Sequence, residues 1–229
     1  MPFHPHLPKP MHGWRAFVGE VGIIVIGVLI ALGAEQVVEA VHHRSQVAEA
    51  VAKLRAESLG NRDGLAFSQA GLQQSIAGID RDLGALGSCD RAIDTARLQP
   101  IERQAFLVPL NAAWLGVRDS ALLPLMPADV VDSYWKIDTI GTYITPMLEN
   151  VSNAFDDAAA ALDTLRGGVN DRQSCVQAVY QLHRLKSAER TLSRQAAFYQ
   201  NSNDQVLRGA GLGLASTKQV TRANAQQSD

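Results

Sequence analysis

Histidines are the residues of this sequence whose type is best suited to chemistry, because their ring nitrogens bind transition metals. His4, His6 and His12 lie in a proline-rich N-terminal segment, but no carboxylate or cysteine lies near them to complete a ligand set. His42 and His43 are adjacent, so on a helix their side chains point about 100° apart and cannot act as an i, i+4 ligand pair. We therefore expect no metal site.

Carboxylates and glycines offer no stronger signal. Asp156, Asp157 and Asp163 fall on the outer face of a predicted helix, and we interpret them as solvated. A two-metal site in a helical bundle would require Glu-x-x-His motifs, and none accompanies these carboxylates. The run GAGLG at residues 209–213 resembles a phosphate-binding loop, but no strand precedes it and no helix follows it.

The three aromatic residues Trp114, Tyr134 and Trp135 could line a ligand pocket, although packing in a core is the interpretation we favour. The sequence has no nucleophile–base pair, metal cluster or cofactor motif, so we expect a protein that is not an enzyme and carries no cofactor. Its 21 Lys and Arg residues nearly balance 23 Asp and Glu residues. Without a basic excess, we expect no nucleic-acid partner.

An apolar run near the N-terminus is the most distinctive feature of the chain. Residues 17–34 form an 18-residue segment in which Glu20 is the only charge. As a helix they would span roughly 27 Å, close to the hydrocarbon thickness of about 30 Å. We therefore predict a transmembrane helix over residues 17–41, after a short tail of residues 1–16, and the lipid bilayer is the first expected partner.

Glu20 stands at the leading edge of this span, where its carboxylate can reach the headgroups and the positive end of the helix dipole favours it. The functional alternative is an intramembrane carboxylate that binds a proton or a partner's cation. A cleavable signal peptide is the alternative to the span itself, with a small-residue cleavage site at residues 31–33. We favour an uncleaved anchor because the helical pattern continues without a break.

Small residues within the span share one helix stripe. Gly27, Ala31 and Ala34 are spaced by four and three residues, and small residues at that spacing let two helix backbones approach closely. They predict a homodimer in the membrane. Small residues are also common in spans that do not dimerise, and the sequence leaves both interpretations open.

The segment HGWRAFVGEVGIIVIGVLIALGAEQVVEAVHHR resembles the start of a group of uncharacterised bacterial single-pass membrane proteins of unknown function. These begin with a short tail, an EVGIIVIGVLIAL-type span and a long helix. The resemblance covers about the first 60 residues. It implies an anchor in the bacterial inner membrane, and it supplies no catalytic residue.

The rest of the chain predicts an all-α fold. A seven-residue apolar step extends one long helix from the span to Leu86, and prolines at 100 and 109 interrupt the next stretch before a helix over 110–123. A third arm over 128–165 should be kinked, and not ended, at Pro146. A last helix over 171–208 completes an up-down-up-down bundle, residues 42–208, and a disordered tail follows over 209–229.

This order of arms places the two cysteines at the same end of the bundle. Cys89 follows the first arm and Cys175 lies in the first turn or so of the last, so a disulfide between them is plausible. Such a bond would place the C-terminal domain in the periplasm and the N-terminus in the cytoplasm, because disulfides persist in oxidising compartments. Two buried free thiols are the alternative.

Together these patterns predict a membrane-anchored helical-bundle interaction or scaffold protein of the bacterial envelope, with a protein partner there. The alternative is a ligand-sensing periplasmic helical bundle that acts through a partner.

Overall fold

The computed structural model describes residues 13–90 and 94–209. All regular secondary structure in these residues is helical. The elements are α1 (Gly13–Leu86), η1 (Thr95–Arg97), α2 (Ala112–Arg118), η2 (Leu123–Leu125), α3 (Ala128–Gly141), α4 (Ile144–Arg166) and α5 (Arg172–Gly209). Residues 1–12, with the three N-terminal histidines, and residues 210–229, most of the expected disordered tail, lie outside the described residues.

The chain divides into two compact units, Met1–Glu49 and Ala50–Asp229. The division falls inside α1, whose 74 residues form one uninterrupted helix, as the sequence predicts. The first unit holds the apolar run, and the second holds all the other helices.

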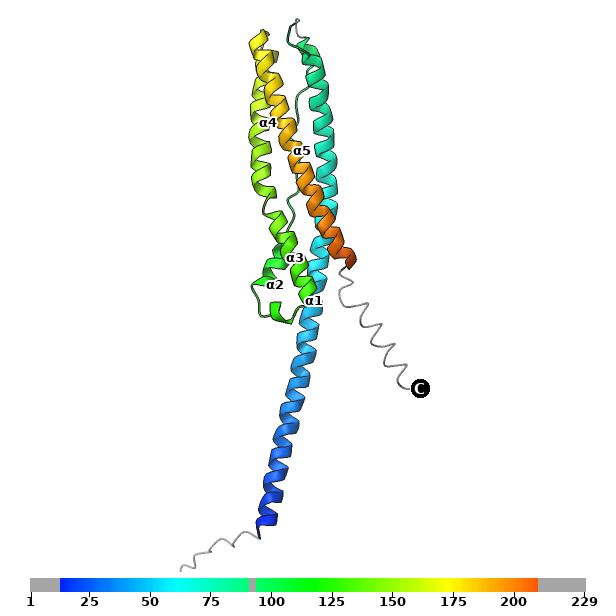
Figure 1. Ribbon diagram of the computed structural model, residues 1–229, viewed down its shortest axis with the longest axis vertical. Helices are drawn as coiled ribbons and strands as arrows, with labels where there is room; N and C mark the ends of the chain where they lie inside the picture. The colour runs from blue at the N-terminus through cyan, green and yellow to red at the C-terminus, as the bar shows by residue number, and fades with distance from the viewer. Residues whose placement is uncertain (1–12, 91–93, 210–229) are drawn as a thin grey trace, which may run out of the picture. The chain divides into compact units, whose positions relative to one another are not determined.

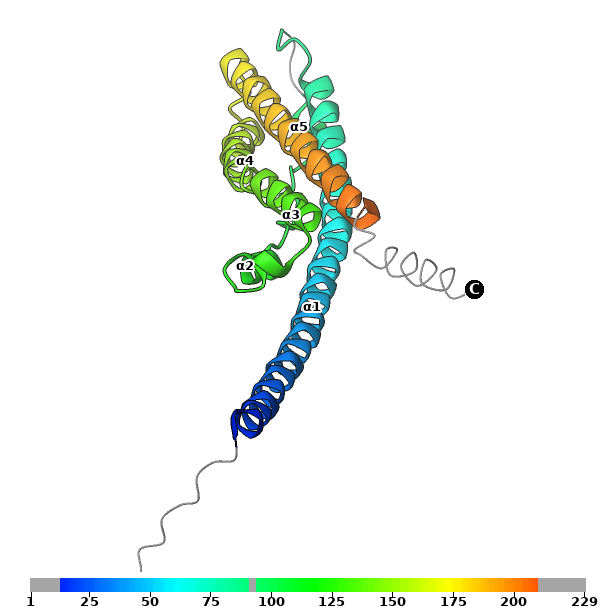
Figure 2. The same cartoon turned by 60° about the horizontal axis from the view of Figure 1, so that its bottom comes forward.

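The core of the second unit lies between the C-terminal part of α1, α4 and α5 (Figure 1). The predicted seven-residue step on α1 is buried, since Leu65, Leu72, Ile79 and Leu86 are at most 4% exposed, and Ile79 and Leu86 belong to this core. Fully burying such a side chain stabilises the fold by about 1.5–3 kcal/mol. Both views show the N-terminal part of α5 beside α4, and α5 then continues past α3 (Figure 2).

The third predicted arm is two helices, so the expectation of a kink without an end is wrong in detail. α3 ends at Gly141 and α4 begins at Ile144, and Pro146 is the third residue of α4. A proline has no N–H to donate four residues back and its ring crowds that carbonyl, which here belongs to Thr142. The helix therefore breaks one turn before the proline, at Thr142 and Tyr143.

The chain between α1 and α3 also differs from the expected helical arm. Residues 98–111 have no regular secondary structure, and the helix predicted over 110–123 is shortened to the seven residues of α2. We call residues 98–111 the extended segment. Pro100 and Pro109 disfavour a helix here, and side chains of α1 supply the backbone hydrogen bonds that a helix would have made internally.

The last turn and helix match their prediction within a residue. α4 ends before Gly167, and Gly168 has a φ of +98°, a conformation that favours glycine. α5 then runs from Arg172 to Gly209. Gly87, expected to follow the end of α1, has a φ of +56° and donates its N–H to the Leu83 carbonyl over 3.1 Å.

Candidate functional site

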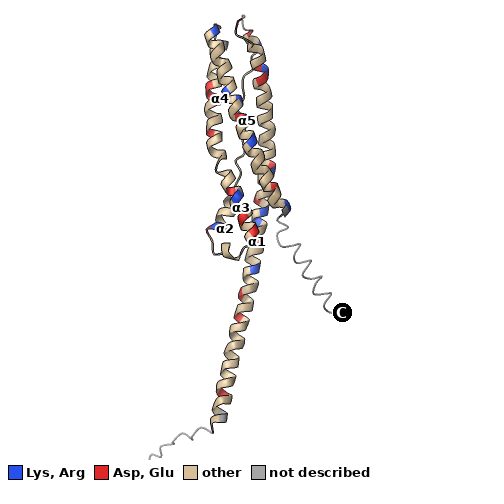
Figure 3. Cartoon of the chain, in the orientation of Figure 1, with Lys and Arg blue, Asp and Glu red and all other residues tan. Residues whose placement is uncertain are grey.

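The apolar run forms an exposed helix in the first unit. α1 is long and apolar enough to cross a membrane, and no residue of its most apolar window is buried. Ile23 is 74% exposed and Ile24 is 65% exposed. No charged residue lies between Glu20 and Glu35 (Figure 3). A signal sequence near an N-terminus also meets these criteria of length and composition, so these features fit both the anchor and its alternative.

The residues predicted to act within the span are all exposed. Glu20 lies in the second turn of α1, and Gly27, Ala31 and Ala34 share one stripe of the same helix. A Cβ atom built on Gly27 would meet nothing within 4 Å. The stripe is therefore open to a neighbouring helix, while its role in packing and the role of Glu20 stay predictions.

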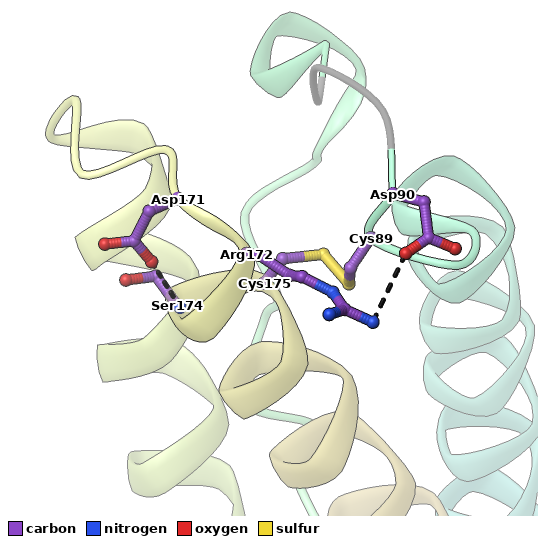
Figure 4. Close-up of a disulfide and its surroundings, with 6 residues drawn as sticks. All are labelled: Cys89, Asp90, Asp171, Arg172, Ser174 and Cys175. Carbon is purple, nitrogen blue, oxygen red and sulfur yellow. Dashed lines mark hydrogen bonds and ion pairs between the residues drawn. A yellow bond between two sulfur atoms is a disulfide. The ribbon is translucent and has the colours of Figure 1, made fainter.

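The two cysteines are brought together across 86 residues of sequence. Cys89 and Cys175 form a disulfide with a Cα–Cα distance of 5.8 Å (Figure 4). An ion pair between Asp90 and Arg172, 3.4 Å apart, lies beside it. Asp171 accepts the backbone N–H of Ser174 over 2.7 Å and so caps α5 one turn before Cys175. The bond joins the end of α1 to the start of α5.

A polar series on α1 holds the extended segment, and sequence reasoning missed it. The Asn61 side chain donates to the Leu110 carbonyl and accepts the Leu110 N–H, each over 2.7 Å. Ser68 Oγ accepts the N–H of Leu107 over 2.8 Å, and Asp82 Oδ1 accepts that of Gln99 over 3.3 Å.

The signal for this series is present in the sequence. Asn61, Ser68, Ser75 and Asp82 are seven residues apart, in step with the apolar series, so all four lie on one face of α1. A polar residue repeated at core spacing indicates a buried polar partner. Burial raises the pKa of Asp82, although its hydrogen bond from Gln99 acts in the opposite direction.

Ser75, the remaining member of the series, contacts a buried carboxylate on α5. Ser75 Oγ donates to Glu189 Oε1 over 2.7 Å. Glu189 is only 3% exposed, and its other oxygen, Oε2, is buried with no hydrogen-bond partner among the described residues. Burial raises the pKa of Glu189 to about 7, against the opposing effect of the Ser75 hydrogen bond.

A pocket of about 230 Å³ adjoins Glu189. It lies between α1, the extended segment, α4 and α5, and it is partly open to solvent. Its walls are mostly apolar. The lining residues are Leu72, Arg103, Gln104, Phe106, Leu148, Val151, Ser152, Phe155, Glu189 and Leu192. We call it the Glu189 pocket.

Arg103 belongs to this pocket but is already paired. Its guanidinium donates to Asp156 and to Ser152, each over 2.6 Å, and lies 4.5 Å from the centre of the Phe155 ring. Opposite charge, hydrogen bonding and a cation–π contact thus fix the cation on α4.

The aromatic residues weighed as a pocket pack against one another instead. Trp114 is 2% exposed and stacks on Tyr134 with ring centres 6.0 Å apart, and Trp135 meets Trp114 edge-on. The space beside them is about 10 Å³, room for one water at most. The Tyr134 hydroxyl hydrogen-bonds Ser58 over 3.1 Å, so core packing is the observed role of Trp114 and Tyr134, whereas Trp135 is 52% exposed.

Within the described residues, no group of three or more His, Cys, Asp and Glu side chains could hold a metal ion. His42 lies 3.0 Å from the Gln46 amide nitrogen and His43 lies 3.8 Å from Glu39. Asp156, Asp157 and Asp163 are exposed, as predicted, and each is in an ion pair with an arginine.

No protein-family model, curated protein or solved structure matches this chain.

Proposed function

We propose that this protein is a membrane-anchored interaction or scaffold protein of the bacterial envelope, with residues 17–41 in the inner membrane. The exposed apolar helix carries the proposal. Side chains such as Ile23 and Ile24 leave most of their surface uncovered, and each would be stabilised by transfer out of water, by about 25 cal/mol per Å². A helix satisfies its own backbone hydrogen bonds, as a span in lipid must.

The C-terminal helical domain, residues 42–208 in four antiparallel arms, would face the periplasm, with the N-terminus in the cytoplasm. The disulfide between Cys89 and Cys175 supports this orientation, because such bonds persist in oxidising compartments and are rare in the reducing cytoplasm.

Exposed aromatic side chains support a binding role for the domain. Phe67, Trp135, Tyr180 and Phe198 are between 52% and 62% exposed. Aromatic residues are enriched among the side chains that dominate protein–protein binding. A second envelope protein is therefore the partner we propose, and the role is binding and not catalysis.

The anchor is tested by the intact mass of the protein taken from the membrane fraction. We expect the full-length chain there, resistant to alkaline carbonate. A matched variant with Ile24→Asp and Val25→Asp should move to the soluble fraction, since a charged residue at a span centre costs about 2.5–3.5 kcal/mol. A mature chain that begins near Ala34 or Glu35 would show a cleaved signal peptide instead.

The partner is tested by a photo-crosslinking residue placed at each of the four aromatic positions in turn, with exposed Gln173, Arg190 and Arg194 as control positions. Crosslinks to one envelope protein that concentrate at the aromatic positions support the scaffold role. Crosslinks spread evenly over both sets, or none at all, contradict it.

Ligand sensing through a partner is the second candidate function, and one observation favours it. The Glu189 pocket contains a buried carboxylate with one unpartnered oxygen. A small molecule that co-purifies with the domain in stoichiometric amount would support sensing.

A further inference from the structure

The Glu189 pocket coincides with a gap in an otherwise regular core. The apolar series of α4 is buried at both ends, since Ile144 is 0% exposed and Leu165 is 1% exposed. In its middle, Leu148, Val151 and Phe155 are only half-buried, and all three line the pocket. These residues continue the core spacing, and Val151 and Phe155 pack against the core, but all three stay partly exposed where they face the pocket.

A buried carboxylate lies at this gap with half of its hydrogen-bonding capacity unused. Ser75 satisfies Oε1 of Glu189, while Oε2 has no partner among the described residues. Removing such a group from water without a partner costs about 1–3 kcal/mol, and more for a charged group. The unpartnered oxygen indicates a missing hydrogen-bond donor, and a ligand could supply it.

We propose that the Glu189 pocket binds a small ligand with a protonated primary amine on an apolar body, and that the ammonium group donates to Oε2 of Glu189. The proposal depends neither on the membrane anchor nor on a protein partner.

The chemistry of the walls selects this class of ligand. Carboxylate oxygens accept hydrogen bonds, so the ligand must donate, and an ammonium donates while neutralising the charge. Leu72, Phe106 and Leu192, with the half-buried residues of α4, would cover an apolar body. Arg103 does not compete for Glu189, because it is held by Asp156 and Ser152.

The volume limits the size of the ligand. The pocket has a volume of about 230 Å³. Sites for drug-sized molecules typically have volumes of about 300–1,000 Å³, so we expect the apolar body of the ligand to be a single ring or a short alkyl chain.

Oε2 of Glu189 is buried, so a ligand reaches it only when side chains that line the pocket move. Gln104, one of these side chains, is half-buried, and its amide donates a hydrogen bond of 3.5 Å to the carbonyl of Glu102.

Three probes with the same apolar body test the proposal by calorimetry on the full chain in detergent. They are 2-phenylethylammonium, 2-phenylethanol and 3-phenylpropionate, which carry a cation, a neutral hydroxyl and an anion. We expect the ammonium to bind most tightly. Glu189→Gln should weaken its binding at least about tenfold, the loss expected for a charge-assisted hydrogen bond. Glu149→Gln, an exposed carboxylate on α4, is the matched control and should leave binding unchanged.

A second variant separates the pocket from the carboxylate. Val151→Trp should fill the gap, abolish binding of the ammonium probe and keep Glu189. Thermal unfolding of each variant shows that it is folded. The proposal is overturned if the ammonium shows no saturable binding, if the three probes bind equally, or if folded Glu189→Gln binds the ammonium as tightly as the unaltered protein.

Discussion

Ser75 on α1 donates a hydrogen bond of 2.7 Å to Glu189 on α5, although 114 residues separate them in sequence. The two residues lie opposite each other because Ser75 belongs to the polar seven-residue series of α1 and Glu189 faces the core from α5. The same face of α1 also supports the extended segment. One polar stripe thus joins the extended segment and α5 to the longest helix.

Stability should fall as pH rises because of Glu189. Burial raises its pKa from 4.5 to about 7, so between these values the folded state binds a proton that the unfolded state has released. The extra stability is complete below pH 4.5 and is lost as pH rises through 7. A change of this size in the pKa corresponds to a loss of about 3 kcal/mol.

Denaturant unfolding at pH 5 and pH 8 checks this expectation, with Glu189→Gln as the comparison. The variant should lose most of the pH dependence and be the more stable protein at pH 8. The pKa of Asp82 is also raised by burial, so any contribution from Asp82 has the same sign. A variant that keeps the full slope would contradict the assignment to Glu189.

Loss of the disulfide should destabilise the helical domain strongly. In the chain-entropy model, a bond that closes a loop of 86 residues reduces the entropy of the unfolded chain. This raises the free energy of unfolding by about 4–5 kcal/mol. We expect Cys89→Ser, Cys175→Ser and the double variant to unfold at much lower denaturant, and nearly equally, since each removes the same bond. Urea titrations with and without reductant measure this. A single variant as stable as the oxidised parent would contradict a stabilising role for the disulfide.

The Asn61 side chain should contribute strongly to the stability of the fold, although it is polar. Its side chain pairs with both backbone groups of Leu110 and also donates to the Tyr199 hydroxyl over 3.2 Å. Asn61→Ala leaves these groups unpaired, so we expect about 2–3 kcal/mol of destabilisation in urea unfolding. Asn153→Ala, on the exposed face of α4, is the control and should change stability by less than about 0.5 kcal/mol.

Self-association of the span is tested by one substitution placed on and off the small-residue stripe. Gly27→Leu would block close approach of two helices, whereas Gly33→Leu in the same span points elsewhere. A membrane two-hybrid assay should show a weaker signal for Gly27→Leu alone. Equal signals from both variants and the unaltered span would contradict a role for the small-residue stripe in self-association.

Local sequence patterns were sufficient to predict much of this fold. Apolar repeats of seven residues need only helical periodicity, so α1 and α5 could be predicted to within a residue or two. The apolar run could be recognised for the same reason, since hydropathy belongs to the residues themselves. The two cysteines could be placed together because a chain that reverses direction at known turns fixes which helix ends meet.

Other features depended on contacts that no local pattern contains. Residues 98–111 are extended because side chains of α1 accept and donate their backbone hydrogen bonds, and those partners lie 17 to 49 residues away. The break before Pro146 falls where the proline leaves the Thr142 carbonyl without its helical donor. Glu189 looks like any helix glutamate in the sequence. Only the packing of α1, α4 and α5 around it removes it from water, and so only the tertiary structure made it a candidate site.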